Sequence, residues 1–159
     1  MKNIILEGPD GSGKSTLANI IAQRVPFTLH PGGGPEKYPG EIVERARQYL
    51  KLDRKIFDRH PLISQPIYGQ FRQGNPIPQE LIDQLYHTKP FIIYVHGVAS
   101  GVHEVKDYDT PEHIEMITRN DDNIRNAYME WASGHAHAIY SVQEGGEETL
   151  IKRCVEYCK

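Results

Sequence analysis

Gly8-Pro9-Asp10-Gly11-Ser12-Gly13-Lys14-Ser15 is the stretch of this sequence that decides the fold. It matches the pattern G-x-x-x-x-G-K-[ST] at every fixed position. Its glycines let successive backbone N–H groups turn inward around a phosphate, where a Cβ would collide with the ligand. The lysine can reach the outer phosphates of ATP, and the last serine is placed to hold Mg²⁺. The residues expected to bind the nucleotide are Gly8, Asp10, Gly11, Ser12, Gly13, Lys14, Ser15 and Thr16.

The segments on either side of this loop have the periodicity that the motif requires. Residues 2–7 form a short apolar run with β-branched side chains, which is typical of a buried parallel strand. After the loop, Leu17, Ile20 and Ile21 fall at helical spacing, with Val25 one turn further on. The order strand, glycine loop, helix favours nucleotide binding over a chance glycine loop between two core elements.

The composition is that of one α/β domain covering residues 1–159. The chain is 38% hydrophobic and 25% charged, with a formal net charge of −3. We therefore expect small-molecule nucleotides as partners and no extended nucleic acid. No apolar run approaches the ~20 residues of a membrane span, and Met1 leads straight into the first strand, so a cytoplasmic protein without a membrane partner is expected. The oligomeric state stays open, with a homodimer as one option.

Strand-like and helix-like patterns alternate along the rest of the chain, which predicts a parallel sheet flanked by helices. The most continuous apolar run, residues 91–95, is expected to be a central strand. Thr110 and Pro111 are a helix start, and the helix that follows is expected to be long. Further strands are expected at 27–30, 55–60 and about 135–142, and further helices at 40–52, 61–73, 79–87 and the C-terminus.

Asp58-Arg59-His60 is the second cluster with chemical meaning. It ends the strand expected from residue 55, and ligands bind at the carboxyl edge of open parallel sheets. Asp58 is expected to reach the Mg²⁺ shell directly or through water, which makes it the second metal residue beside Ser15. Arg59 is expected to hold phosphate oxygens. The expected catalytic residues are Lys14, Asp58 and Arg59, and the alternative is a surface ion pair at a strand end.

Three segments, in order, resemble motifs of the thymidylate kinases. Leu6 to Thr16 resembles the family's hydrophobic-E-G-x-[DE]-G-x-G-K-[ST]-T motif, Phe27 to Gly33 its T-R-E-P-G-G segment, and Asp58 to His60 its D-R-[HY] motif. The resemblance implies a three-layer P-loop kinase fold with a short lid at about residues 98–110. It also implies an ATP-dependent nucleoside-monophosphate kinase that converts dTMP to dTDP.

The same resemblance implies roles for individual residues in binding the acceptor. Asp10 would face the sugar 3′-hydroxyl and Arg59 the phosphates, while Ser64 and Gln65 would lie near the base. Phe71 is a candidate for stacking on the base, although an aromatic residue at helical spacing is more often part of the core. The full set expected to bind the acceptor is Asp10, Pro31, Gly32, Arg59, Ser64, Gln65, Tyr68, Phe71 and Arg72.

The chain departs from the family pattern at two places. Leu29 stands where the family has an arginine that grips the monophosphate, and His30 replaces the neighbouring glutamate. Tyr68 stands one position later than the family's tyrosine against the deoxyribose, which leaves discrimination against ribose open. Another cation must bind the acceptor phosphate, and the sequence does not choose among Arg47, Arg54 and Arg72.

Three further stretches carry weaker signals. Residues 98–109 lie where nucleotide kinases have a closing lid, and Lys106 is their candidate cation. Residues 144–148 could border the adenine of the donor. Cys154 and Cys158 are expected to be reduced thiols without a function.

The expected chemistry is phosphoryl transfer between two anions, for which positioning and charge neutralisation suffice. A monophosphate is already a nucleophile near neutral pH, so no general base is required. One alternative is a P-loop kinase for another small acceptor, such as an alcohol, with Asp58 as the base. The other is a nucleotide-binding switch without catalysis. Substrate profiling, and the dependence of ATP turnover on an added monophosphate, separate these hypotheses.

Overall fold

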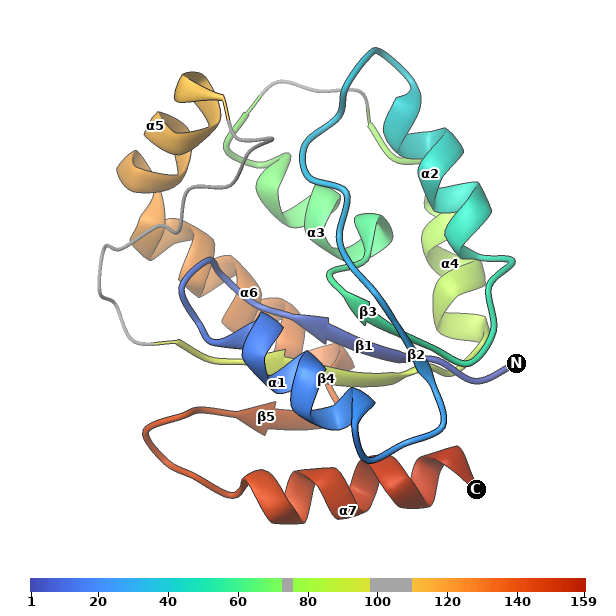
Figure 1. Ribbon diagram of the computed structural model, residues 1–159. Coiled ribbons are helices and arrows are strands. Elements are labelled where there is room, and N and C mark those ends of the chain that lie inside the picture. Colours follow the sequence, from blue (N-terminus) through green and yellow to red (C-terminus); the bar gives the residue numbers. More distant parts are fainter. Residues whose placement is uncertain (73–75, 98–109) are drawn as a thin grey trace.

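The computed structural model describes residues 1–72, 76–97 and 110–159, and in these ranges it has one five-stranded parallel sheet at its centre (Figure 1). The strand order is β2-β3-β1-β4-β5, and every neighbouring pair is parallel. The expected α/β class with a central parallel sheet is confirmed. The strands are β1 (Ile4–Glu7), β2 (Thr28–His30), β3 (Lys55–Asp58), β4 (Phe91–Val95) and β5 (Ala138–Tyr140).

Helices cover both faces of the sheet and complete three layers (Figure 1). The first layer is formed by α1 (Lys14–Ala22) and α7 (Glu147–Cys158), which share one hydrophobic cluster with the sheet. A second cluster joins the opposite face of the sheet to the remaining helices. These are α2 (Glu41–Tyr49), α3 (Pro61–Tyr68), α4 (Gln79–His87), α5 (Pro111–Arg119) and α6 (Asp121–His135).

The apolar character of the central strands follows from this layering. In β1, Ile4 and Leu6 belong to the cluster beneath α1 and α7, whereas Ile5 belongs to the cluster on the other face. All three side chains are fully buried. Alternate residues of a strand point to opposite faces, so a strand covered on both faces needs a continuous apolar run. This is why the sequence showed β1 and β4 so clearly.

The long helix expected after Pro111 is two helices, so that expectation was wrong. Its start is as predicted, because the Thr110 hydroxyl accepts a hydrogen bond from the His113 N–H at 3.1 Å. Asn120 interrupts the helical path with φ −110° and ψ 17°. Its side-chain amide donates to the carbonyl of Met116 at 2.9 Å, which satisfies a group at the end of α5. The apolar period continues across this break and hides it in the sequence.

Other boundaries also differ from expectation: the strand expected at 55–60 ends at Asp58, and the helix expected at 40–52 spans Glu41–Tyr49. The last strand starts at Ala138 because α6 continues to His135, and the loop expected at 144–148 is shortened because α7 begins at Glu147. The helix expected at 61–73 ends at Tyr68, two residues after Pro66. The expected lid at 98–110 lies, except for Thr110, outside the described residues, as does Lys106. Within the described ranges, no helix combines the length and apolar character needed to cross a membrane.

Candidate active site

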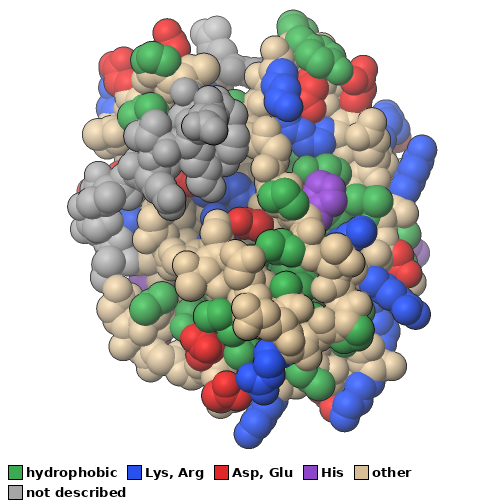
Figure 2. Space-filling model, viewed as in Figure 1, with side chains coloured by type: hydrophobic (Ala, Val, Ile, Leu, Met, Phe, Trp, Pro, Cys, Tyr) green, Lys and Arg blue, Asp and Glu red, His purple; other side chains and the backbone are tan. Residues whose placement is uncertain are grey.

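The glycine loop and the Asp58-Arg59-His60 cluster meet at one edge of the sheet. β1 and β3 are neighbouring parallel strands, with Leu6 opposite Asp58. The Arg59 N–H donates to the carbonyl of Leu6 at 3.0 Å, which ties the two strand ends together. Parallel strands end at the same edge, so the loops that follow β1 and β3 are brought side by side. Figure 2 shows basic and acidic side chains next to each other near the centre of the molecular surface that faces the viewer.

The backbone of the glycine loop has the shape of a phosphate cradle. Gly11 and Gly13 adopt φ values of 78° and 87°, which L-residues with a side chain rarely adopt. A Cβ at Gly8 would lie 2.3 Å from the carbonyl oxygen of Val95. α1 starts at Lys14 with no side-chain hydrogen bond to its first N–H groups. These N–H groups and the helix dipole therefore suit an anion in the loop.

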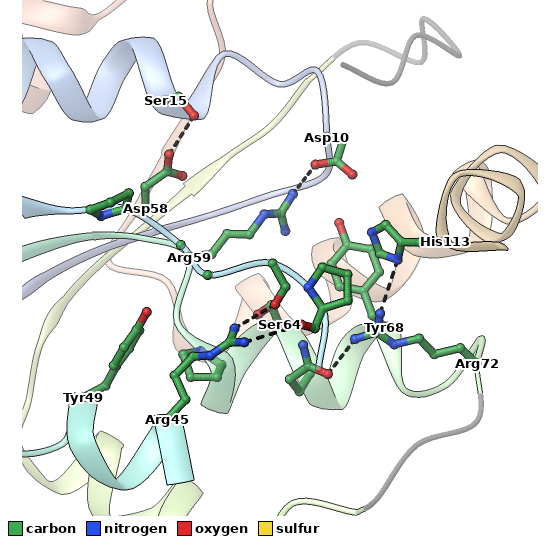
Figure 3. A pocket seen from close by; sticks show the side chains of 17 residues that line it. Asp10, Ser15, Arg45, Tyr49, Asp58, Arg59, Ser64, Tyr68, Arg72 and His113 are labelled. Atoms are coloured by element: carbon green, nitrogen blue, oxygen red, sulfur yellow. Dashed lines mark hydrogen bonds and ion pairs between the residues drawn. The ribbon is translucent and has the colours of Figure 1, made fainter. Parts of the chain in front are cut away.

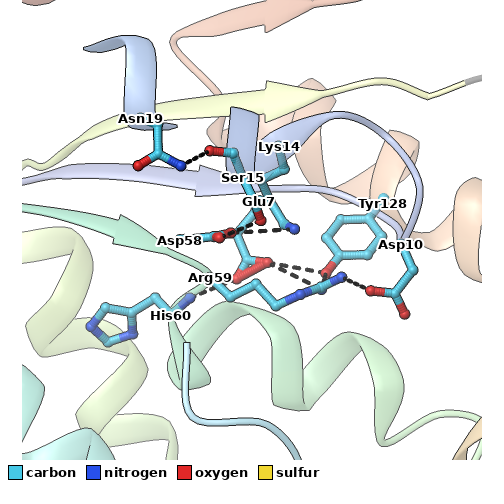
Figure 4. A network of polar contacts seen from close by, with 9 residues as sticks. All are labelled: Glu7, Asp10, Lys14, Ser15, Asn19, Asp58, Arg59, His60 and Tyr128. Carbon is cyan, nitrogen blue, oxygen red and sulfur yellow. Dashed lines mark hydrogen bonds and ion pairs between the residues drawn. The ribbon is translucent and has the colours of Figure 1, made fainter. Parts of the chain in front are cut away.

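Lys14, Ser15 and Asp58 form the polar floor of this loop (Figure 4). The Lys14 ammonium lies 3.3 Å from Asp58 Oδ1, and the Ser15 hydroxyl donates to Asp58 Oδ2 at 2.6 Å. Burial, with Arg59 nearby, lowers the pKa of Lys14 to about 8. Burial alone would raise the pKa of Asp58, but Lys14 and the Ser15 hydroxyl lower it overall, so Asp58 is a carboxylate at neutral pH.

The oxygen atoms at this floor fit a hard cation. The Ser15 hydroxyl and the Asp58 carboxylate are oxygen donors of the kind that Mg²⁺ prefers. Asp58 Oδ1 is buried and has no hydrogen-bond partner among the described residues, although Lys14 lies near it. A buried carboxylate oxygen in this state can take a further ligand. The arrangement agrees with the expected roles of Ser15 and Asp58 without testing them.

Arg59 is held by groups from three parts of the chain, two of which, Asp10 and Tyr128, are drawn in Figure 4. Its Nη2 donates to Asp10 Oδ1 at 2.7 Å and its Nη1 to the Tyr128 hydroxyl at 3.0 Å. Its guanidinium also lies over the Tyr68 ring, 5.3 Å from the centroid. Its backbone φ of 74° is unusual for a residue with a side chain. The guanidinium is therefore fixed between the glycine loop, α3 and α6.

Glu7 lies beneath Arg59 and is completely buried. It accepts hydrogen bonds from the His60 N–H at 2.9 Å and from the Tyr128 hydroxyl at 3.1 Å. Burial raises the pKa of this carboxyl to about 7, against the opposing influence of Arg59 and Lys14. Glu7 is the single acid in the strand that leads into the glycine loop. This exception to the apolar pattern is the feature of the sequence that marks Glu7 as a candidate functional residue.

A cavity of about 330 Å³ opens beside these groups (Figure 3). It extends from Ser15 and Asp58 past Arg59 to Tyr68 and Arg72. Eight of the nine residues expected to bind the acceptor line it: Asp10, Pro31, Gly32, Arg59, Ser64, Gln65, Tyr68 and Arg72. The cavity is continuous with the glycine loop, so a molecule bound in it would lie next to the phosphates of a bound nucleotide.

Comparison with known proteins supports the fold. No protein-family model and no curated protein matches this sequence. The solved structure of the YorR protein from Bacillus subtilis, in complex with phosphorylated GDP, matches with a TM-score of 0.71 and 22% identity, over 97% of this chain and 94% of that one. Deoxyadenosine kinase from M. mycoides, with dCMP and dCDP bound, matches with a TM-score of 0.54 and 17% identity, over 98% and 97%. This chain has a nucleotide-kinase fold.

Of the three arginines expected to replace the missing family arginine, the nucleotide-kinase fold brings one to the cavity. Arg72 lines it, where Nη2 donates to Gln65 Oε1 at 2.6 Å and Nη1 lies 3.3 Å from His113 Nδ1. Arg47 is exposed on α2. The backbone of Arg54 is bonded to Lys2 and Thr28, at the opposite edge of the sheet. Arg47 and Arg54 are therefore wrong candidates for this cavity.

Two more expectations need correction or limits. Phe71 packs against the hydrophobic cluster beneath α3 and does not line the cavity, so the ordinary core interpretation holds for it. Thr16 is exposed on α1, one residue past the cradle. Sequence reasoning also missed several cavity residues, among them Arg45, Tyr49 and His113. Arg45 is bonded to Glu41, one helical turn earlier, and to the carbonyls of Gly34 and Pro35, which holds the loop after β2 against α2.

Proposed function

We propose that this protein is an ATP-dependent kinase that transfers a phosphoryl group to a nucleoside monophosphate, with dTMP as the preferred acceptor and dTDP as the product. One observation carries the proposal. Three arginines, Arg45, Arg59 and Arg72, line the cavity beside the glycine loop. The acids among the described lining residues are Asp10 and Asp58, and each is paired with a cation. A cavity with this charge suits an acceptor that carries a phosphate.

The structural neighbours support a nucleotide as the acceptor. One is a deoxyadenosine kinase whose structure contains dCMP and dCDP, and the other holds phosphorylated GDP. These ligands belong to the neighbours, and at 17% and 22% identity only the fold is shared with certainty. The choice of dTMP rests on the resemblance of three motifs to the thymidylate kinases. In this proposal residues 1–159 form one kinase domain.

On the donor side, the glycine loop would bind the phosphates of ATP through its backbone N–H groups and Lys14. Ser15 and Asp58 would hold Mg²⁺, which neutralises negative charge on the phosphates when bound. The Lys14 ammonium is buried next to Asp58, so it is held in place before any ligand arrives. A preorganised cation in a site shielded from water stabilises developing charge more strongly than a mobile surface lysine does.

In the reaction, an oxygen of the acceptor phosphate forms a bond to the terminal phosphorus of ATP while the bond from that phosphorus to the bridging oxygen breaks. ADP leaves with the electron pair of the broken bond. No proton has to be removed from the nucleophile, since a monophosphate is ionised near neutral pH. Arg59 lies between the cradle and the cavity and would reduce the repulsion between the two anions. Asp58 is engaged with Lys14 and Ser15, which supports a role in positioning these two groups over that of a general base for an alcohol.

On the acceptor side, the sugar would lie between Asp10 and Tyr68, and the base near Ser64 and Gln65. Asp10 accepts a hydrogen bond from Arg59, which fixes its carboxylate at the junction of loop and cavity. Tyr68 is buried, and its hydroxyl has no hydrogen-bond partner among the described residues. A buried hydroxyl without a partner is costly, so we expect the bound acceptor to satisfy it.

The test is a panel of acceptors with ATP and Mg²⁺, followed by ADP release in a coupled assay. The panel contains the deoxynucleoside and ribonucleoside monophosphates and the corresponding nucleosides. We expect ADP release that depends on a monophosphate, with the highest kcat/KM for dTMP. Phosphorylation of nucleosides but not of monophosphates would establish a kinase for hydroxyl acceptors instead. ADP release that is independent of any acceptor would favour a nucleotide-binding switch.

A further inference from the structure

Tyr128 connects Arg59 and Glu7, which form a long ion pair with each other but no direct hydrogen bond among the described contacts. It lies on α6 and is completely buried. Its hydroxyl donates a hydrogen bond to Glu7 Oε1 at 3.1 Å and accepts one from Arg59 Nη1 at 3.0 Å (Figure 4). The Arg59 Nη1 and Glu7 Oε1 atoms themselves are 3.9 Å apart. The tyrosine oxygen therefore bridges the Arg59 guanidinium and the Glu7 carboxyl group, which lie beyond direct hydrogen-bond distance of each other.

The separation matters because the Glu7 side chain is completely buried and that of Arg59 is only 19% exposed. Glu7 is completely buried, and attraction between opposite charges grows as the surrounding dielectric falls. Without the hydroxyl, Arg59 Nη1 would lose its acceptor and Glu7 would lose a donor. The simplest way to satisfy both groups is to shorten the distance between Arg59 Nη1 and Glu7 Oε1 until the two atoms form a hydrogen-bonded ion pair. That movement would draw the guanidinium towards β1, away from the cavity beside the glycine loop.

The remaining contacts of Arg59 do not prevent this movement by themselves. Asp10 holds the other terminal nitrogen, Nη2, and the Tyr68 ring covers one face of the guanidinium. With two contacts left, the guanidinium can still rotate about the Nη2 contact. The Tyr128 hydroxyl fixes the second terminal nitrogen, so the orientation of the guanidinium plane depends on it.

We propose that Tyr128 is a positioning residue for phosphoryl transfer, whose hydroxyl keeps the Arg59 guanidinium apart from Glu7 and oriented between the glycine loop and the acceptor cavity. This inference rests on the proposed function, because it needs Arg59 to act on phosphates. It assigns a role in the reaction to α6, a helix that contributes no residue to the lining of the cavity within the described ranges.

The direct test is Tyr128→Phe, which removes one oxygen atom and keeps the ring. The ring stacks on Tyr94 with centroids 6.0 Å apart, and this packing is retained. We expect kcat for the monophosphate reaction to fall roughly tenfold, which corresponds to about 1.4 kcal/mol in activation free energy. The KM for ATP should stay within twofold, because the glycine loop and Lys14 are unchanged. Thermal unfolding of the variant verifies that it is folded.

Tyr94→Phe is the matched control. Tyr94 is also completely buried and stacks on Tyr128, but its hydroxyl is bonded to His96 Nδ1 at 3.1 Å and to neither Arg59 nor Glu7. The Tyr94→Phe substitution, like Tyr128→Phe, removes one hydroxyl oxygen from the same part of the core. We expect kcat of Tyr94→Phe to stay within twofold of the wild type. Equal losses in both variants would show a general packing effect and overturn the positioning role.

A coupling experiment separates action through Arg59 from any other effect. In an Arg59→Lys background, Tyr128→Phe should cause no further loss of kcat in single-turnover measurements, because the guanidinium that it orients is gone. A second tenfold loss in this background would overturn the proposal. The wild type is measured first. If the wild type shows no acceptor-dependent turnover, the proposed function is refuted. If the wild type turns over and Tyr128→Phe is unimpaired, only the role of Tyr128 is refuted.

Discussion

Arg72 is our proposed substitute for the arginine that the thymidylate kinases have at the position of Leu29, because it lines the cavity beside the glycine loop. Its guanidinium lies in the cavity, donates to Gln65 Oε1 and His113 Nδ1, and covers Tyr68 with 6.0 Å to the ring centroid. Within the described ranges it forms no close ion pair, but the Glu36 carboxylate raises the pKa of Arg72 and partly offsets the effect of burial. Burial lowers the pKa of its guanidinium, so the group is already partly desolvated, but an arginine stays charged at neutral pH. An acceptor phosphate would be its natural counter-ion.

We therefore expect Arg72→Ala to weaken binding of the acceptor and leave the donor unaffected. A hydrogen bond between charged groups contributes about 1.5–3 kcal/mol. At 1.4 kcal/mol for each factor of ten, its loss raises the KM for the monophosphate by roughly 10- to 150-fold. The guanidinium has only neutral hydrogen-bond partners in the described residues, so the stability loss should be about 1–2 kcal/mol.

The assay is steady-state kinetics with dTMP and ATP varied in turn, with Arg47→Ala as the control. Arg47 carries the same charge but is exposed on α2, away from the cavity. Its removal should change neither KM by more than twofold. The reasoning would be refuted by an unchanged dTMP KM in Arg72→Ala. A parallel rise of the KM values for dTMP and ATP would refute it as well, since it would show a general distortion of the site.

Lys14→Ala should abolish turnover. The substitution should also lower the midpoint of thermal unfolding, because Lys14 is buried against Asp58. A turnover number close to that of the wild type would exclude the glycine loop as the catalytic site. Asp10→Asn should lower kcat/KM for dTMP, by a factor that corresponds to a loss of a few kcal/mol at most in transition-state binding. Removing the 3′-hydroxyl from the acceptor should then impair the wild type more than this variant, and equal factors would show that the contact does not exist. Burial lowers the pKa of His60 to about 3, so the folded protein keeps this histidine neutral while the unfolded chain takes up a proton below about pH 6.5. The free energy of unfolding should fall as the pH falls from 6.5 towards 3, with a slope of up to ~1.4 kcal/mol per pH unit. His60→Asn keeps an acceptor for the Leu62 N–H and should remove this slope. Identical slopes in urea titrations of the two proteins would contradict the assignment.

The sequence by itself determined the part of the fold around the glycine loop. The glycine loop, the strand before it and the helix after it are one contiguous stretch, and their geometry depends on backbone conformations that glycine permits and on local periodicity. The position of Asp58 and Arg59 could also be predicted, because the carboxyl ends of parallel strands share one edge of a sheet. These features require only short-range signals and one general rule of topology.

The lining of the cavity beside the glycine loop was decided by the tertiary structure. Arg45 and Arg47 are two residues apart on one helix, yet Arg45 lines the cavity and Arg47 is exposed, because α2 packs with only one face against the sheet. Arg54 carries the same charge but precedes its strand, which puts it at the far edge of the sheet. Residue type alone could not separate these arginines.

The network beneath Arg59 depends still more on long-range packing. Tyr128 is 69 residues from Arg59 and 121 residues from Glu7 along the chain, yet its hydroxyl bonds to both. In the sequence, Tyr128 has the helical spacing of an ordinary core residue, and nothing local distinguishes its hydroxyl from that of Tyr94. Only the packing of α6 against β4 and α3 places that oxygen between Glu7 and Arg59, because contacts between distant segments are fixed by the fold and leave no periodic trace in the sequence.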